Sequence, residues 1–184
     1  MLRLFWRRLA ASALTFPTLR GWGYVAAALG ASAAVSLPLG LATGFFNPRQ
    51  RVRDTSLVLR VSAGAFVVPA LLEEAVFRAA LLPHPAVDPA GALGPAAFAR
   101  AAVGPLALFV VAHLANPRPQ SRAVFQDWRF LALAGALGAA CSAAYWATGG
   151  SLAAAAVAHH VPIVVWMFGL GGWQRLGFDR QGGR

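Results

Sequence analysis

The sequence predicts an all-α integral membrane protein, in which a bundle of about five transmembrane helices surrounds a polar intramembrane site. Three observations lead to this fold class. Of the 184 residues, 58% are hydrophobic and only 12% are charged, whereas a soluble domain carries about 25% charged residues. The apolar residues are grouped into five runs long enough to cross a bilayer. Ionisable side chains interrupt three of these runs.

The first two runs are the longest, and they differ in polarity. Gly21 to Phe46 contains no charged residue and exceeds the roughly 20 apolar residues that a span needs. Val61 to Leu82 is also long enough to cross, but it contains three charged residues, Glu73, Glu74 and Arg78. We therefore expect two spans, of which the second carries part of a polar site.

The other three runs are Phe98 to Asn116, Phe130 to Thr148 and Leu152 to Leu170. The first of them contains His113, and the last contains His159 and His160. Because only residues 149–151 separate the last two runs, we expect these to form a tight antiparallel pair. Alanine and glycine are frequent in every run, and small side chains let helix backbones approach closely in a membrane.

The expected domain organisation is a single transmembrane helical domain over residues 21–176, as the length of the chain supports. Residues 1–20 combine arginines with a short apolar stretch, which predicts a basic N-terminal segment lying in the membrane interface. Residues 177–184 are expected to form a basic C-terminal tail. The sole cysteine, Cys141, excludes a disulfide framework and a zinc site built from several cysteines.

The charge pattern points to lipid partners. All 16 basic residues are arginines, and the net charge is +10. Most arginines lie between the apolar runs, which is typical of loops that meet anionic lipid headgroups. No basic groove interleaved with aromatic residues is visible, so we expect no nucleic acid partner. The expected location is a bacterial inner (plasma) membrane, and arginines on both sides of the spans leave the orientation of the N-terminus open.

Ionisable groups inside a membrane span are costly, so each one is a functional hypothesis. Glu74 and Arg78 are four residues apart on one helical face, which predicts an intrahelical ion pair. Glu73 lies about 100° round the helix from Glu74 and is free to face another partner. A carboxylate in a low-dielectric site suits a general base that acts near neutral pH.

A carboxylate and two imidazoles brought together in the bundle can act in two related ways. Glu73, His113 and His159 can bind a divalent metal such as zinc, which then activates water. Alternatively, Glu73 and His113 can activate water directly while His159 donates a hydrogen bond to the oxyanion. Both routes lead to hydrolysis. No serine lies in a nucleophile-elbow context that would favour a serine hydrolase.

Three short motifs resemble those of a known family. Glu73-Glu74-Ala-Val-Phe-Arg78 matches the EExxxR motif, and Phe109-Val-Val-Ala-His113 matches the FxxxH motif, of the CPBP (CAAX protease and bacteriocin-processing, or Abi) intramembrane endopeptidases. Ser151-Leu152 leading to His159 resembles the third motif of this family. The resemblance extends from Val68 to Leu176. The stretches Leu81 to Pro85 and His160 to Trp166 look most like the cyanobacterial and plastid-type branch.

The resemblance implies a role for each motif residue. Glu73 would be the catalytic base that activates water together with His113, and His159 would help to hold the oxyanion. The bracing residues would be Glu74 and Arg78. Four residues after the third-motif histidine the family usually has Asn or Asp, whereas this chain has Ile163. The candidates to replace this oxyanion donor are Asn116 and His160.

The expected function is therefore that of an intramembrane endopeptidase. Its substrate would be a membrane-associated protein or peptide, including lipidated, CAAX-like ones, cleaved by water that Glu73 and His113 activate. One alternative is a non-catalytic membrane scaffold, or an immunity or assembly factor, that uses the same pocket for binding. A second alternative is a proton-linked transporter, but five spans without an inverted repeat are poorly suited to alternating access.

Overall fold

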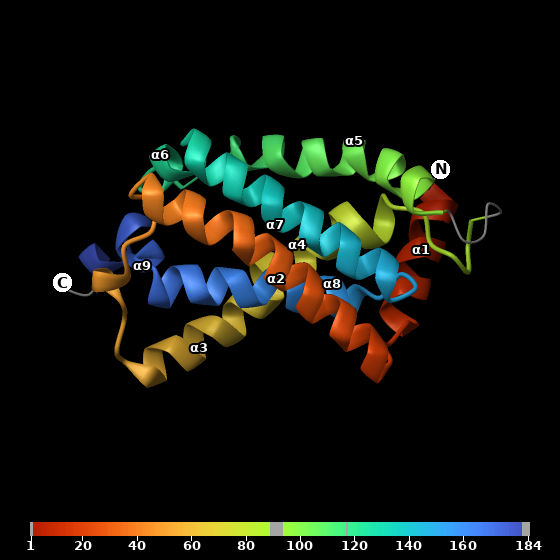
Figure 1. Ribbon diagram of the computed structural model, residues 1–184, viewed down its shortest axis with the longest axis horizontal. Coiled ribbons are helices and arrows are strands. Elements are labelled where there is room, and N and C mark those ends of the chain that lie inside the picture. The colour runs from red at the N-terminus through yellow and green to blue at the C-terminus, as the bar shows by residue number, and fades with distance from the viewer. Residues whose placement is uncertain (1, 89–93, 117, 182–184) are drawn as a thin grey trace.

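The computed structural model describes residues 2–88, 94–116 and 118–181, and within these ranges the secondary structure is helical (Figure 1). Five helices are long and apolar enough to cross a membrane, as predicted: Leu19–Ala42, Thr55–Ala80, Pro95–His113, Trp128–Ala147 and Leu152–Gly169. The two ends of the chain lie at opposite ends of the bundle (Figure 1). Residues 182–184 of the predicted basic tail lie outside the described residues.

Four of the membrane spans are named α2 (Leu19–Ala42), α5 (Pro95–His113), α7 (Trp128–Ala147) and α8 (Leu152–Val164), the last continuing as η4 (Val165–Gly169). Side-chain caps fix where three of them begin. The side chains of Thr18, Asp127 and Ser151 accept hydrogen bonds from backbone N–H groups in the first turns of α2, α7 and α8, respectively. Such caps satisfy N–H groups that the helix leaves unpaired.

The remaining span is interrupted in its middle. It begins as α3 (Thr55–Ala65) and continues as η2 (Phe66–Leu71), α4 (Leu72–Glu74) and η3 (Ala75–Ala80), of which η2 and η3 have π-helical character. Val68 has extended backbone angles, and Pro69 follows it without an N–H to donate. Short π-helical stretches occur often at functional sites. Here they flank the two adjacent glutamates.

Small side chains allow the spans to pack closely. Helix α7 packs against α2, α5 and α8, and one buried cluster joins three of these helices through Val25, Cys141, Ala144, Ala154 and Ala158. The predicted tight turn between α7 and α8 is also present. Gly149 and Gly150 have φ angles of +72° and +92°, which favour glycine because they lie in the left-handed region.

The N-terminal helix α1 (Leu2–Leu14) is docked against the bundle rather than detached from it. It packs on η3, and the buried hydroxyl of Ser12 is 2.9 Å from the Tyr145 hydroxyl of α7. Arg8 forms an ion pair with Asp88 and donates a hydrogen bond to the carbonyl of Leu81. These contacts tie the first helix to the loop that follows the interrupted span.

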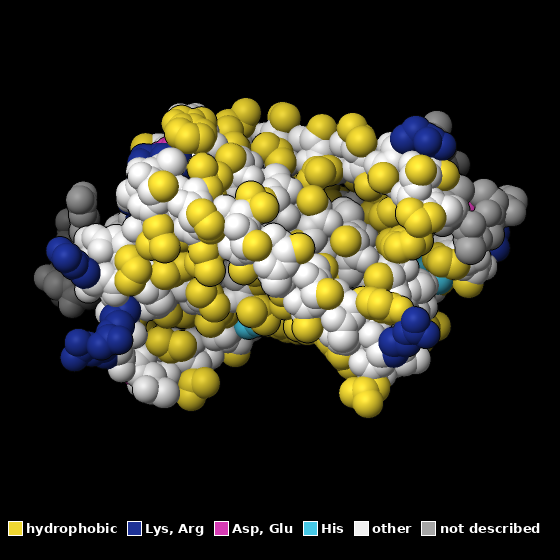
Figure 2. Space-filling model, in the orientation of Figure 1, with side chains coloured by type: hydrophobic (Ala, Val, Ile, Leu, Met, Phe, Trp, Pro, Cys, Tyr) yellow, Lys and Arg dark blue, Asp and Glu magenta, His cyan; other side chains and the backbone are white. Residues whose placement is uncertain are grey.

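Apolar side chains are spread across the whole face seen in Figure 2, whereas the arginines lie towards its two ends. Large apolar residues remain exposed along the spans, among them Leu41, Leu59, Val103, Leu108 and Val111. A soluble monomer exposes few such contiguous patches. The chain is an integral membrane protein, and these exposed apolar side chains lie on the helices that cross the membrane.

Candidate active site

A large cavity lies between the spans. Its volume is about 1050 Å³, and residues of α2, α3, α5, α7 and α8 line it together with Phe45 and Phe46 of the loop after α2. Most of the lining is apolar or aromatic. Among the described residues, four ionisable side chains line the cavity, and these are Glu73, His113, Arg118 and His159. The three residues expected to carry the chemistry therefore share one space.

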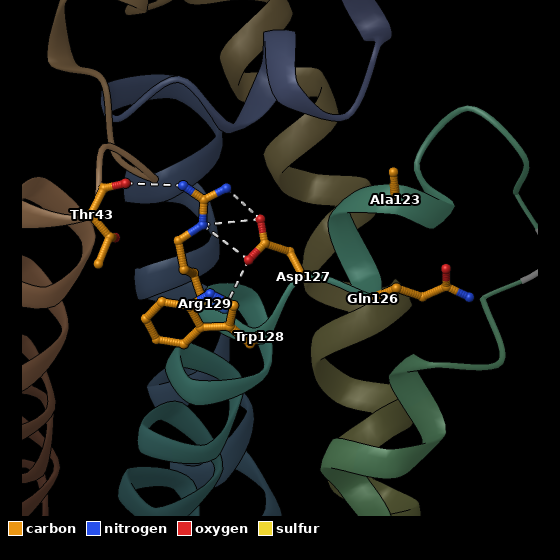
Figure 3. A pocket seen from close by; sticks show the side chains of 6 residues that line it. All are labelled: Thr43, Ala123, Gln126, Asp127, Trp128 and Arg129. Atoms are coloured by element: carbon orange, nitrogen blue, oxygen red, sulfur yellow. Dashed lines mark hydrogen bonds and ion pairs between the residues drawn. The ribbon is translucent and has the colours of Figure 1, made fainter.

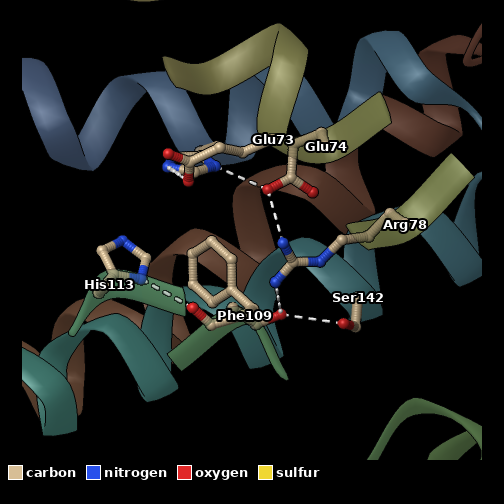
Figure 4. A network of polar contacts seen from close by, with 8 residues as sticks. Glu73, Glu74, Arg78, Phe109, His113 and Ser142 are labelled. Carbon is tan, nitrogen blue, oxygen red and sulfur yellow. Dashed lines mark hydrogen bonds and ion pairs between the residues drawn. The ribbon is translucent and has the colours of Figure 1, made fainter. Parts of the chain in front are cut away.

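A charged network lies beside this cavity. The carboxylate of Glu74 is fully buried, and its Oε1 accepts hydrogen bonds from Nη1 of Arg78 at 2.8 Å and from Nδ1 of His159 at 2.6 Å. The predicted ion pair between Glu74 and Arg78 is thus present (Figure 4). The contact with His159 was not predicted, because it joins different spans and depends on their relative rotation.

Arg78 is held by two further groups. Its Nη2 donates to the carbonyl of Gly138 at 2.9 Å, and its guanidinium carbon lies 4.4 Å from the ring centroid of Phe109. A Cβ atom at Gly138 would lie 2.7 Å from Nη2 of Arg78 and 2.6 Å from Cδ1 of Leu106. Glycine is required here for close approach, but a glycine in an alanine-rich run gives no sequence signal of that role.

Glu73 is oriented differently from its neighbour. Its side chain is 29% exposed and lines the cavity. The Oε2 atom is buried without a hydrogen-bond partner among the described residues, and Nε2 of His159 lies 3.8 Å from it. The partly exposed carboxylate of Glu73 therefore faces the cavity, whereas its Oε2 atom is closed off beside His159.

His113 is fixed by its own helix and by aromatic rings. Its Nδ1 lies 2.8 Å from the carbonyl oxygen of Phe109 (Figure 4). Because a carbonyl only accepts, Nδ1 must donate, and in the neutral ring Nε2 then carries the lone pair. The rings of Phe109, Phe125 and Phe130 surround the imidazole at centroid distances of 4.7, 5.9 and 5.3 Å. The ring has a defined orientation with Nε2 left for water or substrate.

The structure places the remaining predicted site residues in different surroundings. Asn116 lines the cavity, and its Oδ1 accepts a hydrogen bond from the backbone N–H of Arg118 at 2.9 Å. Ile163 also lines the cavity. His160 is not among the lining residues, and its Nε2 lies 3.1 Å from the Ser62 hydroxyl of α3. The structure therefore does not bring His160 to the site.

One group of side chains could hold a metal ion by its spacing. Ligand atoms of Glu74, Cys141 and His159 lie within 4.8 Å of one another, and this is the one such group among the described residues. The set expected from the sequence, Glu73 with His113 and His159, does not meet that spacing. Moreover, Oε1 of Glu74 already accepts from a guanidinium and an imidazole. Oε2 of Glu74 has no hydrogen-bond partner among the described residues and is the carboxylate oxygen that would be left for a cation.

A second pocket of about 670 Å³ lies at the start of α7 (Figure 3). Its charged residues already have partners. Arg129 pairs with Asp127 at 2.5 Å and donates to the carbonyl of Thr43 at 2.9 Å. The hydrogen bonds from Arg129 lower the pKa of Asp127. This corner therefore ties the loop after α2 to α7.

Comparison with known proteins gives one match. The family described as "Type II CAAX prenyl endopeptidase Rce1-like" matches residues 55–162, more than half of the chain. The matched region contains Glu73, Glu74, Arg78, His113 and His159. Neither the comparison with curated proteins nor the comparison with solved structures gives a match.

Proposed function

Because the chain belongs to the Rce1-like family of type II CAAX prenyl endopeptidases, and so to a family of peptidases, we propose that it hydrolyses a peptide bond at membrane depth. The observation that carries this proposal is the pairing of two free groups in one cavity. Oε2 of Glu73 has no hydrogen-bond partner among the described residues. Nδ1 of His113 is held by the carbonyl of Phe109, and Nε2 has no hydrogen-bond partner in the part of the chain that the structure describes.

In the proposed mechanism a water molecule binds between these groups. Glu73 takes one proton from the water, while Nε2 of His113 accepts a hydrogen bond from the other. The resulting hydroxide attacks the carbonyl carbon of the scissile bond and forms a tetrahedral oxyanion. Collapse of this intermediate breaks the C–N bond, and Glu73 returns its proton to the leaving amine.

His159 is proposed to stabilise the oxyanion, with Glu74 as its positioning residue. Because Nδ1 of His159 donates to Glu74, a donor at Nε2 requires the imidazolium form. In that form, two positive charges, on Arg78 and His159, balance the two carboxylates. Donors that are held in place before the reaction need no rearrangement as the negative charge develops.

A second oxyanion donor is proposed at Asn116. The family's usual Asn or Asp is replaced by Ile163, which lines the cavity but cannot donate a hydrogen bond. Asn116 lines the same cavity, and its Oδ1 is occupied by the backbone N–H of Arg118. The amide Nδ2 is then the group left to donate. Loss of an oxyanion donor lowers the rate by about 10²–10³-fold, so substitutions at Asn116 and Ile163 should change the rate measurably.

The proposed substrate is a membrane-associated peptide or protein, including CAAX-like, lipid-modified ones, and the proposed location is a bacterial plasma membrane. The apolar lining and the volume of about 1050 Å³ support a lipidated peptide as occupant. The stretches 81–85 and 160–166 support a place in the cyanobacterial and plastid-type branch.

The test uses the protein in nanodiscs with a library of lipidated and unlipidated peptides, and mass spectrometry detects the cleavage products. We expect cleavage by the wild type and its loss in Glu73→Gln and His113→Gln. The matched control is His160→Gln, which changes a neighbouring histidine that does not line the cavity and should keep activity. Chelator treatment separates a metal-dependent reaction from direct Glu/His activation of water.

Two results would contradict the proposal. If Glu73→Gln cleaves as fast as the wild type, Glu73 is not the base. If the folded wild type binds a peptide but cleaves none of the library, the scaffold function is favoured, and Ile163 is then the first position to restore to Asn. Proton-linked flux that depends on Glu73 would instead favour the transporter.

A further inference from the structure

Arg118 differs from the other arginines in its relation to the cavity. Among the described residues, it is the one arginine that lines the cavity of about 1050 Å³. It lies five positions after His113, just beyond the end of α5. The backbone N–H of Asn116 donates to the carbonyl of His113 at 3.2 Å, so the chain continues to turn beyond the helix. A cation is therefore anchored close in sequence to a proposed catalytic histidine.

The charge of Arg118 is also available. Arg8, Arg78 and Arg129 each form an ion pair with a carboxylate. The guanidinium of Arg118 has no such partner among the described residues, and its side chain is exposed. Its backbone, in contrast, is held, because the N–H donates to Oδ1 of Asn116 at 2.9 Å. The backbone of Arg118 is thus fixed at the cavity wall, and its guanidinium has no carboxylate partner among the described residues.

The chemistry of a CAAX-like substrate matches this arrangement. The modified cysteine of such a substrate is followed by three residues, the last of which ends in a free α-carboxylate. Three extended residues span about 10 Å. A substrate cleaved beside His113 would therefore place its carboxylate a short distance along the cavity wall. Arginine binds carboxylates by two parallel hydrogen bonds, which gives both affinity and orientation.

We propose that Arg118 binds the free C-terminal carboxylate of the substrate. This inference rests on the proposed function. Arg118 is a specificity-determining residue, since it would contact the substrate far from the scissile carbonyl. An internal segment of a longer protein offers no carboxylate at this position and would be a poor substrate.

The experiment compares two prenylated peptides that are identical except for a C-terminal acid or a C-terminal carboxamide. Binding is measured to the Glu73→Gln protein, which keeps the peptide intact, in nanodiscs of neutral lipid. We expect the acid to bind about tenfold or more tightly than the amide, as loss of a charge-assisted hydrogen bond implies. Adding Arg118→Gln should remove this preference, whereas adding Arg122→Gln, a nearby exposed arginine that does not line the cavity, should keep it.

The outcomes separate this inference from the proposed function. Equal binding of acid and amide, no binding of either, or a preference that persists in the Arg118→Gln protein would overturn it, even if the wild type cleaves peptides. A preference that requires Arg118 supports it, even if the wild type cleaves neither peptide and the endopeptidase proposal fails. A parallel measurement uses nanodiscs that also contain anionic lipid. Enrichment of that lipid that depends on Arg118, without an acid preference, would assign the arginine to lipid headgroups and also overturn the inference.

Discussion

Glu73 and Glu74 are consecutive residues of one span, but their carboxylates lie in opposite surroundings. Glu74 is fully buried, and its Oε1 accepts hydrogen bonds from Arg78 and His159. Glu73 is 29% exposed, and its Oε2 has no hydrogen-bond partner among the described residues. One position along a helix turns a side chain by about 100°. The comparison teaches that fold stability and chemistry can be assigned to neighbouring residues of the same type.

The largest expected effect tests Glu73, the partly exposed member of the pair. Glu73→Gln keeps the shape of the side chain but removes the base, so we expect kcat/KM to fall by about 10²–10⁴-fold. The melting temperature in detergent should stay close to that of the wild type, because no described residue donates a hydrogen bond to Oε2 of Glu73 and Nε2 of His159 lies 3.8 Å from it. A large fall in the melting temperature would show that Glu73 also supports the fold.

Changes in the buried network of Glu74 should lower the stability of the fold. Arg78→Met removes the guanidinium and leaves the buried carboxylate of Glu74 with His159 as its remaining partner, and breaking a buried ion pair in this way costs about 3–5 kcal/mol of unfolding free energy. Adding Glu74→Gln in the same chain should recover part of this loss, because the unpaired charge is then removed. Thermal or denaturant unfolding in detergent measures both variants. Wild-type stability of the single variant would contradict the bracing role.

Gly138→Ala tests whether the buried network of Glu74 and Arg78 depends on close helix packing. The added Cβ would lie 2.7 Å from Nη2 of Arg78 and 2.6 Å from Cδ1 of Leu106, and we expect a loss of about 1–3 kcal/mol. The matched control is Gly135→Ala on the same helix, where the nearest atom within 4 Å is Cγ2 of Val110 at 3.9 Å. Equal melting temperatures of the two variants would argue against a required glycine at position 138.

Ile163→Asn changes the cavity in which Glu73 lies. It introduces the amide that the resembled family usually has at this position. Ile163 lines the cavity, so the new side chain can donate to the oxyanion without entering the Glu74 network. We expect kcat to be preserved or to rise by up to about tenfold, less than the full value of an oxyanion donor. A large loss of kcat would show that this site is built differently from the family pattern.

The smallest effect lies away from both glutamates, in the loop after the interrupted span. Burial lowers the pKa of His84, Asp88 opposes this shift and Arg8 adds to it. The unfolded chain therefore binds a proton at His84 at a higher pH than the folded chain does. Stability should be complete above about pH 6.5 and should decrease as the pH falls below it. Melting curves at pH 7.5 and 5.5 check this, and His84→Gln should reduce the difference.

Much of this architecture could be predicted from the sequence because it depends on local pattern. The five spans follow from runs of apolar residues, and the pair of Glu74 with Arg78 follows from a spacing of four. The contact of Glu74 with His159 could not be predicted, since it depends on how two spans are rotated. The extended backbone at Val68 was also missed, although Pro69 is visible in the sequence.

His160 shows the same limit within one helix. The sequence places it next to His159, and one step turns it by about 100° towards α3. The structure pairs it with Ser62, which no spacing rule relates to position 160. In contrast, the orientation of His113 depends on the carbonyl of Phe109, one turn earlier in the same helix. A spacing rule predicted the pair of Glu74 with Arg78 within one span, whereas no rule predicted the contacts between spans that Glu74 makes with His159 and His160 makes with Ser62.

The hydroxyl contact between Ser12 and Tyr145 has a consequence for biosynthesis. Its two partners are 133 residues apart in the chain. At 5–20 residues per second, the ribosome needs roughly 7 to 27 s to make that stretch. Leu81 and Asp88, the partners of Arg8, lie only 73 and 80 residues further along the chain and are made earlier. The contacts of α1 with the interrupted span can therefore form first, and its contact with α7 is completed last.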